Sequence, residues 1–478
     1  MHRCLFRQAL LSLFALGAVA ALCLPAAAVA GPEKSQSKHR TPRALIKRGT
    51  LKQLPGQRGC LATRPAKGSC APARGLRGAG PFMGSRAIAV SPDGRNVYVA
   101  ASRSDAIAVF SRERGTGALT QPRGSAGCVA AQGAEGCGRA IGLDGPNSVA
   151  VSPDGRFLYA TARDSASVAV FHRDRSSGAL RQLPPGSGCV SGLPIPGCAP
   201  GRALSGPDVV VVSPDGENLY VGSFFGNAVA TFVRAKNGAL YQAAGTEGCI
   251  AEAIAGCATG IALGAPEGLA ISPDGTSLYV GSALSNAVAV LNRDAAAGGV
   301  LSQATGGSGC VADQALAGCS GGVQLAGANA VAISPAGRDV YVTSLLSNSV
   351  TAFSRSAAGV LTQKPGTAAC LIFLRAAGCS FGRAMVGPEG IAVSPDGASV
   401  YVASFRSGAI DVLDRERESG VVRQKPGKPG CLAPAKVPDC TRGRALAGVS
   451  SIAVSPDGRN VYSTAFAGNA VAVFRRIR

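Results

Sequence analysis

The chain has 478 residues, and its 48 Lys and Arg residues outnumber its 27 Asp and Glu residues to give a formal net charge of +21. A basic balance of this size points to nucleic acid, to an anionic surface or to an acidic ligand. The chain has no Trp and only 5 % aromatic residues to stack on bases. We therefore expect no nucleic-acid partner, and consider an anionic envelope polymer, an unknown small molecule, or a basic surface without a particular partner.

The first 30 residues have the pattern of a secretory signal peptide. Two arginines within the first seven residues precede an uncharged, mostly apolar stretch over 9–30, which ends in Ala28-Val29-Ala30. We predict a signal peptide over 1–30, a basic flexible linker over 31–48, and a mature protein outside the cytoplasmic membrane of a bacterium, with no membrane span. The stretch is also long enough to stay as an uncleaved anchor, since about 20 apolar residues cross a membrane.

One pattern then repeats seven times along the chain. Ser-Pro-Asp-Gly starts at Ser91, Ser152, Ser213, Ser272, Ser394 and Ser455, and a seventh copy at Ser334 has Ala336 in place of Asp. Successive starts lie 59 to 62 residues apart, and a tyrosine follows each Ser by seven residues. A fixed period of this length indicates a repeat architecture.

Each period contains four short strands. In the second copy, the apolar runs 147–152 and 156–161 flank Pro-Asp-Gly turn residues, and further strands are expected over 166–172 and 178–182. Four short strands without helical periodicity describe one blade of a β-propeller. We predict an all-β, seven-bladed β-propeller over 49–478, with four antiparallel strands per blade.

The two ends of the chain complement one another. The last copy stops after its third strand, and the missing fourth strand has the pattern Gly-x-Leu-x-Gln. Residues 49–53 (GTLKQ) carry that pattern before the first repeat. We therefore predict that an N-terminal outer strand completes the last blade and closes the ring, leaving no exposed sheet edge.

The cysteines follow the same period. Fourteen of the sixteen form seven local pairs, which are Cys60 with Cys70, Cys128 with Cys137, Cys189 with Cys198, Cys249 with Cys257, Cys310 with Cys319, Cys370 with Cys379, and Cys431 with Cys440. An even, repeated count in an exported protein predicts seven local disulfides. A metal site would need tighter Cys-x-x-Cys spacing or neighbouring histidines, so we expect no metal and no cofactor.

An apolar strand, Ser-Pro-Asp-Gly, a strand such as Val97-Tyr98-Val99 and an Asn-Ala-Val-Ala-Val strand together resemble the YVTN-repeat and seven-bladed lactonase-type propellers. The resemblance covers roughly 49–478. It implies the propeller fold and, as an activity, ring-opening hydrolysis of a lactone in the manner of 6-phosphogluconolactonase. By this resemblance Glu267 or Glu389 would be the base, and Arg163 or Arg406 would polarise the carbonyl.

The repeated aspartates and tyrosines are expected to serve turns and packing between blades, because every copy needs them alike. A ligand site is expected where the copies differ, at one mouth of the central channel. The residues just before the innermost strands are Asn147, Asp208, Glu267, Asn329 and Glu389, with Arg86 and Ser450 in the outer two copies. The loops between second and third strands add Arg163, Phe224, Phe225, Leu284, Leu345, Phe405, Arg406 and Phe466 to the same face. Variable solvent-facing loops are the alternative.

Four arginines follow the second cysteine of a pair: Arg139, Arg202, Arg383 and Arg444. They are candidates for binding phosphate or carboxylate groups. The alternative is that they pair with turn carbonyls or acids.

Two functions stay open. The sequence has no Gly-x-Ser-x-Gly elbow and no metal-ligand cluster, and its repeats are uniform. These features favour a monomeric scaffold at the cell envelope that binds a ligand or partner. A lactone hydrolase that uses the carboxylates of the channel mouth is the alternative, so whether the chain is an enzyme stays undecided.

Overall fold

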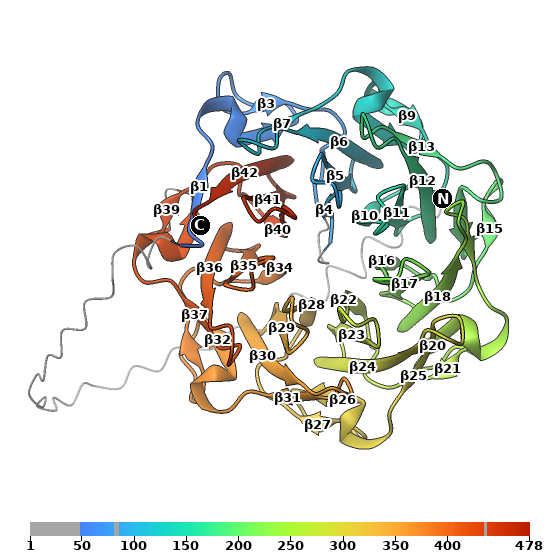
Figure 1. Cartoon of the computed structure of the whole chain (residues 1–478), viewed down its shortest axis with the longest axis vertical. Coiled ribbons are helices and arrows are strands. Elements are labelled where there is room, and N and C mark those ends of the chain that lie inside the picture. Colours follow the sequence, from blue (N-terminus) through green and yellow to red (C-terminus); the bar gives the residue numbers. More distant parts are fainter. Residues whose placement is uncertain (1–47, 81–85, 435–436) are drawn as a thin grey trace, which may run out of the picture. The chain divides into compact units, whose positions relative to one another are not determined.

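The computed structural model describes residues 48–80, 86–434 and 437–478. The predicted signal peptide, and all but the last residue of the predicted linker, lie outside the described residues. Within the described ranges, no helix is long and apolar enough to cross a membrane. The described residues form seven β-sheets around a central channel (Figure 1), and this confirms the seven-bladed propeller.

Three antiparallel strands form the body of each blade. The innermost strands of blades 1 to 7 are β4 (Ile88–Val90), β10 (Pro146–Val151), β16 (Pro207–Val212), β22 (Pro266–Ile271), β28 (Ala328–Ile333), β34 (Pro388–Val393) and β40 (Val449–Val454). The second strands are β5 (Asn96–Ala101), β11 (Phe157–Ala162), β17 (Asn218–Ser223), β23 (Ser277–Ser282), β29 (Asp339–Ser344), β35 (Ser399–Ser404) and β41 (Asn460–Ala465). The third strands are β6 (Ala106–Arg112), β12 (Ser167–Arg173), β18 (Ala228–Arg234), β24 (Ala287–Asp294), β30 (Ser349–Arg355), β36 (Ala409–Arg415) and β42 (Ala470–Arg476). Their valines, isoleucines and alanines pack against the neighbouring blade on each side, as strands buried on both faces require.

The outer edge of a blade has more strands than the sequence predicts. In blade 2, β13 (Leu180–Gln182) pairs with the end of β12 as the expected fourth strand. Next along the chain, β14 (Cys189–Ser191) pairs antiparallel with the beginning of the same strand, β12. β15 (Ala199–Pro200) then pairs parallel with β14. Each sheet therefore has six strands and one parallel pair, because the cysteine segment, which the sequence suggests is a loop, joins the ladder.

Seven disulfides connect the predicted local pairs, and every predicted pairing is confirmed. The bridges are Cys60–Cys70, Cys128–Cys137, Cys189–Cys198, Cys249–Cys257, Cys310–Cys319, Cys370–Cys379 and Cys431–Cys440. The paired cysteines are eight to ten residues apart in sequence, and their Cα atoms are separated by 4.7–4.8 Å. In blade 2 the bridge joins the first residue of β14 to the residue that precedes β15. The disulfides thus hold together the short outer strands, which have few ladder hydrogen bonds of their own.

The N-terminal segment closes the ring as predicted. β1 (Leu51–Gln53) pairs antiparallel with the end of β42, with Leu51 opposite Arg476. β2 (Cys60–Ala62) pairs with the beginning of the same strand, and β3 (Ala71–Pro72) pairs with β2. Blade 7 is thus built from both ends of the described chain, which appear side by side in Figure 1.

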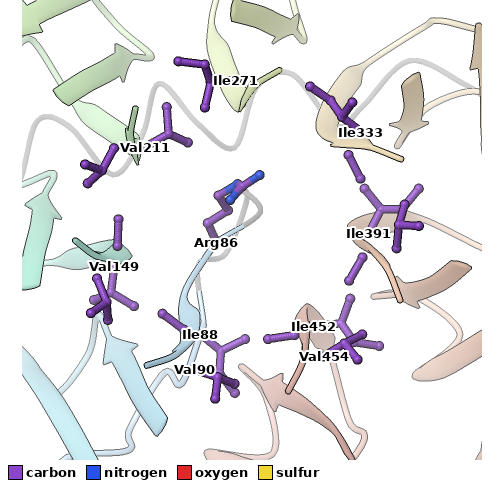
Figure 2. Close-up of a pocket in the computed structure, with 18 of the residues that line it drawn as sticks. Arg86, Ile88, Val90, Val149, Val211, Ile271, Ile333, Ile391, Ile452 and Val454 are labelled. Carbon is purple, nitrogen blue, oxygen red and sulfur yellow. The ribbon is translucent and has the colours of Figure 1, made fainter. Parts of the chain in front are cut away.

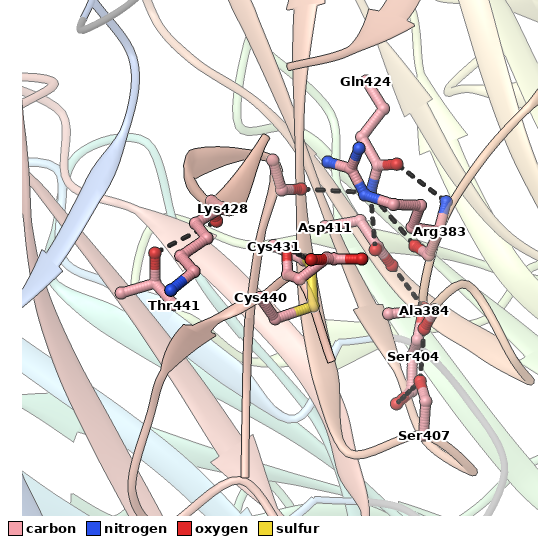
Figure 3. Close-up of a disulfide and its surroundings, with 12 residues drawn as sticks. Arg383, Ala384, Ser404, Ser407, Asp411, Gln424, Lys428, Cys431, Cys440 and Thr441 are labelled. Carbon is pink, nitrogen blue, oxygen red and sulfur yellow. Dashed lines mark hydrogen bonds between the residues drawn. A yellow bond between two sulfur atoms is a disulfide. The ribbon is translucent and has the colours of Figure 1, made fainter. Parts of the chain in front are cut away.

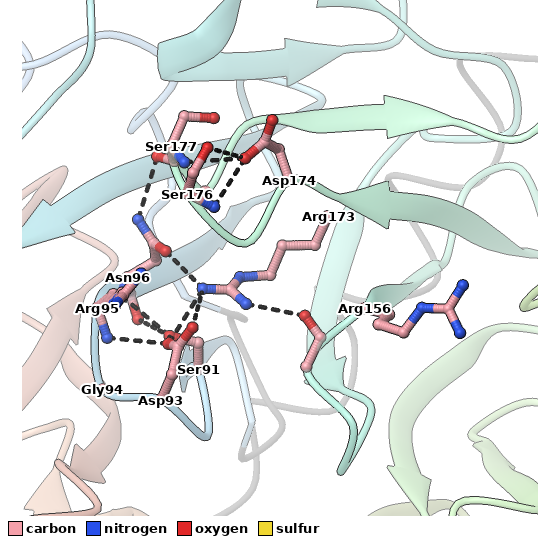
Figure 4. Close-up of polar contacts among 12 residues, drawn as sticks. Ser91, Asp93, Gly94, Arg95, Asn96, Arg156, Arg173, Asp174, Ser176 and Ser177 are labelled. Atoms are coloured by element: carbon pink, nitrogen blue, oxygen red, sulfur yellow. Dashed lines mark hydrogen bonds and ion pairs between the residues drawn. The ribbon is translucent and has the colours of Figure 1, made fainter.

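An arginine at the end of each third strand ties neighbouring blades together. Arg173 is buried, and its Nε donates to the Tyr98 hydroxyl of blade 1 at 2.6 Å. Its Nη2 donates to both carboxylate oxygens of Asp93 at 3.0–3.1 Å, and its Nη1 donates to the Gly155 carbonyl at 2.8 Å (Figure 4). We call this arrangement the clasp; its seven arginines are Arg112, Arg173, Arg234, Arg293, Arg355, Arg415 and Arg476. The repeated aspartates and tyrosines therefore have the structural roles expected of them.

In blade 5 the clasp is present, but a different residue supplies its carboxylate. The methyl side chain of Ala336 cannot accept a hydrogen bond, and the clasp residue Arg415 pairs instead with the buried Asp339, three residues further along. The Lys364 ammonium contacts the other carboxylate oxygen of Asp339 at 2.8 Å. The carboxylate has moved, while its charge and its partner are retained.

Candidate ligand site at the channel mouth

The innermost strands surround a cavity of about 450 Å³ that runs along the channel (Figure 2). The residues that line it are almost entirely Val, Ile and Ala, and their backbone atoms reach the cavity beside their side chains. Pro153 and Pro395, from two Ser-Pro-Asp-Gly turns, mark one end of the cavity. The opposite end lies where the innermost strands begin, and the predicted site residues lie there.

The structure brings the predicted polar residues together at this mouth. Asn147, Asp208, Glu267, Asn329 and Glu389 are each the second residue of an innermost strand, and all five are buried, with 0–5 % of their surface exposed. Their equivalent positions place them around one opening. The ring is polar although the channel below it is aliphatic.

Asp208 is the centre of a small polar cluster between blades 2 and 3. Its Oδ1 accepts a hydrogen bond from Asn147 Nδ2 at 2.7 Å and a second from the Arg163 guanidinium. Its Oδ2 is buried and has no hydrogen-bond partner among the described residues. Burial raises the pKa of Asp208, and the attraction of Arg163 opposes this shift without cancelling it.

Glu267 and Glu389 complete a set of three interacting carboxyls. Burial, reinforced by repulsion from Asp208, raises the pKa of Glu267 to about 8, while Arg163 opposes the shift. Burial and repulsion from Glu267 raise the pKa of Glu389 well above its usual value, while Arg406 opposes this shift. Glu389 Oε2 is buried without a partner in the described part of the chain. Burial thus favours the protonated form of both glutamates, and Glu267, with its pKa near 8, is largely protonated at neutral pH.

Asn329 differs from the carboxyls because the protein itself satisfies its amide. Its Nδ2 donates to the Pro388 carbonyl at 3.2 Å, and its Oδ1 accepts hydrogen bonds from Ala330 N at 2.7 Å and from Thr343 Oγ1 at 2.6 Å. Asn329 therefore positions the starts of two neighbouring innermost strands. Its predicted role in ligand binding stays a prediction.

Phenylalanines and arginines form the rim above the ring. The Arg163 guanidinium lies 5.1 Å from the Phe224 ring centroid and 5.7 Å from that of Phe225. On the other side, the Phe405 and Phe466 rings are 6.5 Å apart, and Arg103 lies 4.4 Å over Phe466. Cation–π contacts of this kind hold the rim loops in place.

The arginines that follow the cysteine pairs contact the blade periphery. Arg202 donates to the Ala243 and Gly245 carbonyls of the next blade at 2.8–2.9 Å. Arg383 and Arg444 make the same kind of contact. These are the turn carbonyls of the alternative interpretation, and a ligand role for these arginines stays a prediction.

Arg139 does not belong to this set, and the sequence missed its true fourth member. Ile141, two residues after Arg139, receives the glutamine contact that Arg202 receives in the next blade, with its backbone N donating to Gln182 Oε1 at 2.8 Å. Arg74 occupies the equivalent position before blade 1 and donates to the Gly124 carbonyl at 2.9 Å. The Gly-Arg pair at 138–139 shifted the sequence alignment by two residues.

The sequence also missed a further buried carboxyl, Asp411. It lies opposite Cys431 in blade 6 and accepts hydrogen bonds from Ser404 Oγ at 2.7 Å and Gln424 Nε2 at 3.0 Å, close to the Cys431–Cys440 disulfide (Figure 3). Burial raises the pKa of Asp411 to about 8. The sequence could have indicated this residue, because the equivalent strand position in blades 1 to 4 is alanine and an aspartate there is an exception to the repeat.

The described residues contain no group of three His, Cys, Asp or Glu side chains arranged to hold a metal ion. The site defined so far is an aliphatic channel closed on one side by a ring of protonatable carboxyls and an aromatic rim.

Residues 87–187 and 264–437, more than half of the chain, match the family described as "Lactonase, 7-bladed beta-propeller", and the chain belongs to this family. No curated protein matches the chain in sequence. Among solved structures, it is similar to a putative 6-phosphogluconolactonase from Bacteroides uniformis, with 19 % identity and a TM-score of 0.51, over 78 % of this chain and 88 % of that one. It is also similar to a functionally unknown protein from Desulfotomaculum acetoxidans, with 15 % identity and a TM-score of 0.51, over 80 % and 92 % of the two chains. These likenesses show the shared fold.

Proposed function

We propose that the chain is an exported ligand-binding protein and that its ligand site is the carboxyl ring of the channel mouth. The observation that carries the proposal is the set of three buried carboxyls, of which Asp208 and Glu389 each retain an unpartnered oxygen. A buried polar atom without a partner is costly, by about 1–3 kcal/mol. A ligand that supplies the missing hydrogen bonds removes this cost.

The chemistry of the ring favours a neutral, hydroxyl-rich ligand. Protonated carboxyls both donate and accept hydrogen bonds and carry no charge, and the pKa of Glu267 is raised to about 8 by burial and by Asp208. Hydroxyl groups match such donors and acceptors. The phenylalanines of the rim offer flat apolar faces beside them. A sugar or a sugar lactone combines these two properties.

Two observations support an extracytoplasmic location. Seven disulfides form and persist in oxidising compartments. The net charge of +21 favours attraction to anionic polymers of the cell envelope. Adsorption of the mature protein to purified cell-wall polymer, if it is electrostatic, weakens as salt rises from about 0.05 M to about 0.5 M.

Hydrolysis of a lactone is the second candidate, and the raised pKa of Glu267 favours it. Burial raises the pKa of Glu267 to about 8, and in its deprotonated form, which grows as pH approaches 8, the carboxylate can take a proton from water as the water adds to a lactone carbonyl. The acyl–oxygen bond then breaks, and the proton passes to the released hydroxyl. Arg163 lies beside this carboxyl set. The similar structure from Bacteroides uniformis bears the name of a putative 6-phosphogluconolactonase.

One experiment separates these two functions. Calorimetry with a panel of neutral monosaccharides measures binding, and a pH-stat with glucono-δ-lactone measures turnover above the spontaneous rate. For a binding protein we expect affinity without turnover, and a Kd at least about tenfold weaker in Glu389→Gln, which is about 1.4 kcal/mol. Asp411→Asn is the matched control, because it removes a buried carboxyl that makes its hydrogen bonds in blade 6.

The outcomes are distinct. Turnover that Glu267→Gln abolishes, and that Asp411→Asn leaves unchanged, makes the protein a hydrolase. Binding that Glu389→Gln and Asp411→Asn weaken equally, or no binding by any sugar of the panel, contradicts the proposed site.

A further inference from the structure

The channel below the carboxyl ring is a second environment with a different chemistry. Its cavity of about 450 Å³ lies within the range of roughly 300–1,000 Å³ that is usual for small-molecule pockets. Figure 2 shows a ring of aliphatic side chains around it, among them Val149, Val211, Ile271 and Ile391. The wall extends to Pro153 and Pro395, which are exposed at the Ser-Pro-Asp-Gly end. A ligand can therefore enter from the side opposite to the carboxyl ring.

Arg86 is the one charged residue among the described residues that line this cavity. The sequence suggested that Arg86 belongs to the polar ring, but its guanidinium points into the aliphatic channel (Figure 2). Its backbone carbonyl accepts a hydrogen bond from Val149 N at 3.0 Å, which fixes the residue against blade 2. Within the described ranges the guanidinium forms no salt bridge and no hydrogen bond, and burial lowers the pKa of Arg86.

The clasps show what a buried arginine normally has in this protein. Arg173 pairs with a carboxylate, a tyrosine hydroxyl and a carbonyl, and Arg415 pairs with Asp339. Arg86 is half-buried, and within the described residues its guanidinium has none of these partners. A guanidinium that reaches into a cavity without a carboxylate of its own is suited to take an anion as its partner.

We propose that the channel binds an aliphatic monocarboxylate, with its carboxylate on Arg86 and its hydrocarbon chain along the wall toward the Ser-Pro-Asp-Gly end. The guanidinium presents two parallel N–H donors that match the two oxygens of a carboxylate. The Val, Ile and Ala side chains of the wall favour a hydrocarbon tail, since contact with them removes methylene groups from water. The four steps along the backbone from Val149 to Pro153 span roughly 13 Å at about 3.3 Å per residue, which sets the length of the tail.

The charge of the site selects a monoanion. A single guanidinium balances a single negative charge, and no second cation lines the cavity among the described residues. A phosphate dianion would leave one charge uncompensated against isoleucine and valine side chains. This site is separate from the carboxyl ring and goes beyond the function proposed for that ring.

The test uses sodium octanoate as the probe and the mature protein. Calorimetry should show binding of octanoate with a negative heat-capacity change, which marks burial of apolar surface. Octan-1-ol lacks the charge and acetate lacks the tail, so both should bind at least about tenfold more weakly. Arg86→Met keeps the length and apolar stem of the side chain and should weaken octanoate binding at least about tenfold.

Two controls make the result specific. Arg95→Met removes an equal charge from an exposed position beside the Ser-Pro-Asp-Gly turn of blade 1 (Figure 4), and it should leave the Kd for octanoate unchanged. Glu389→Gln alters the carboxyl ring and should also leave it unchanged. Octanoate at about 100 times its Kd should raise the melting temperature of the wild type and not that of Arg86→Met.

The proposal is wrong if octanoate does not bind, if octan-1-ol binds as tightly as octanoate, or if Arg86→Met binds octanoate as the wild type does. If Arg86→Met fails to fold, the comparison of the three probes on the wild type decides the question alone. Loss of octanoate binding in Glu389→Gln would assign the anion to the carboxyl ring and so contradict the channel site.

Discussion

The two ends of the channel are built on opposite principles. At the Ser-Pro-Asp-Gly end, every blade presents an arginine, a tyrosine and a carboxylate, supplied by Asp339 in blade 5, and the charges are paired. At the other end, the equivalent positions of five blades carry Asn147, Asp208, Glu267, Asn329 and Glu389, and two of the three carboxyls have an unpartnered oxygen within the described residues. The regular end joins the blades, while the irregular end has polar groups that the protein leaves for something else to satisfy.

The difference is also electrostatic. At the regular end, burial raises the pKa of Asp457, but hydrogen bonds from Ser455 and Arg112 outweigh it and lower the pKa to about 2. At the irregular end, burial is the dominant cause and raises the pKa of Glu267 to about 8. Carboxyls of one protein are thus held charged at one end of the channel and uncharged at the other.

The largest effect should come from breaking a clasp. Arg173→Met leaves Asp93, Tyr98 and Asn96 without their shared donor in a buried site. Removing one partner of a buried ion pair costs about 3–5 kcal/mol, and urea unfolding under oxidising conditions measures it. The exposed Arg175→Met is the control and should stay within about 0.5 kcal/mol of the wild type. Equal stability of the two variants would show that the clasp is not structural.

A smaller effect, with a built-in rescue, is expected in blade 5. Asp339→Ser introduces the residue found at the equivalent position of blades 4 and 6, and leaves Arg415 and Lys364 without their carboxylate. We expect a loss of about 3 kcal/mol, the low end for a broken buried ion pair, because a serine here can still accept a hydrogen bond from the clasp arginine, as Ser277 does from Arg355. Adding Ala336→Asp restores the carboxylate of the other blades and should recover more than half of the loss. A double variant no more stable than Asp339→Ser would refute the exchange of carboxylates.

The smallest effect is expected at the mouth. Low pH favours the protonated carboxyl of Glu389 further, because burial and repulsion from Glu267 already raise its pKa well above the usual value; the comparison is therefore made at pH 5. Glu389→Gln then replaces one neutral group by another of the same shape, and the free energy of unfolding should change by less than about 0.5 kcal/mol. A large destabilisation at pH 5 would show that Glu389 carries a structural charge, as the clasp aspartates do.

The sequence predicts the regular part of the molecule well, because repetition exposes it. Seven blades, the closure of blade 7 by residues 49–53 and the seven disulfides all follow from the period. The clasp arginines could also have been predicted, since each lies 21 residues after the first residue of its Ser-Pro-Asp-Gly copy, or of the Ser-Pro-Ala-Gly copy at Ser334. The role of Asp339 could not have been predicted, because it depends on the position of Arg415 in the next blade.

The irregular part was less predictable. The sequence placed Asn147 and Asp208 at one mouth, but their hydrogen bond depends on how neighbouring blades pack. The direction of Arg86 into the channel depends on side-chain orientation, which no periodicity reports. The sequence pointed to Arg139 and missed Arg74, because the loops of the blades differ in length. The parallel pairing of β14 with β15 was not predicted, because β15 is only two residues long.

The pH dependence of stability tests most directly whether the two ends hold their carboxyls in opposite states. Between the unfolded pKa near 4.3 and about 8, the folded protein holds a proton on Glu267 that the unfolded chain has lost, so stability falls as pH rises, by up to about 1.4 kcal/mol per pH unit for one proton. The clasp carboxylates act in the opposite sense, and their contribution is lost as pH falls from about 4 toward 2. We predict that the double variant Glu267→Gln with Glu389→Gln reduces the loss of stability between about pH 4.3 and 8 and does not change the loss below about pH 4. Asp411→Asn alone measures how much of the loss between about pH 4.3 and 8 comes from Asp411. A loss of stability between about pH 4.3 and 8 that is the same in the double variant and in the wild type would contradict this account.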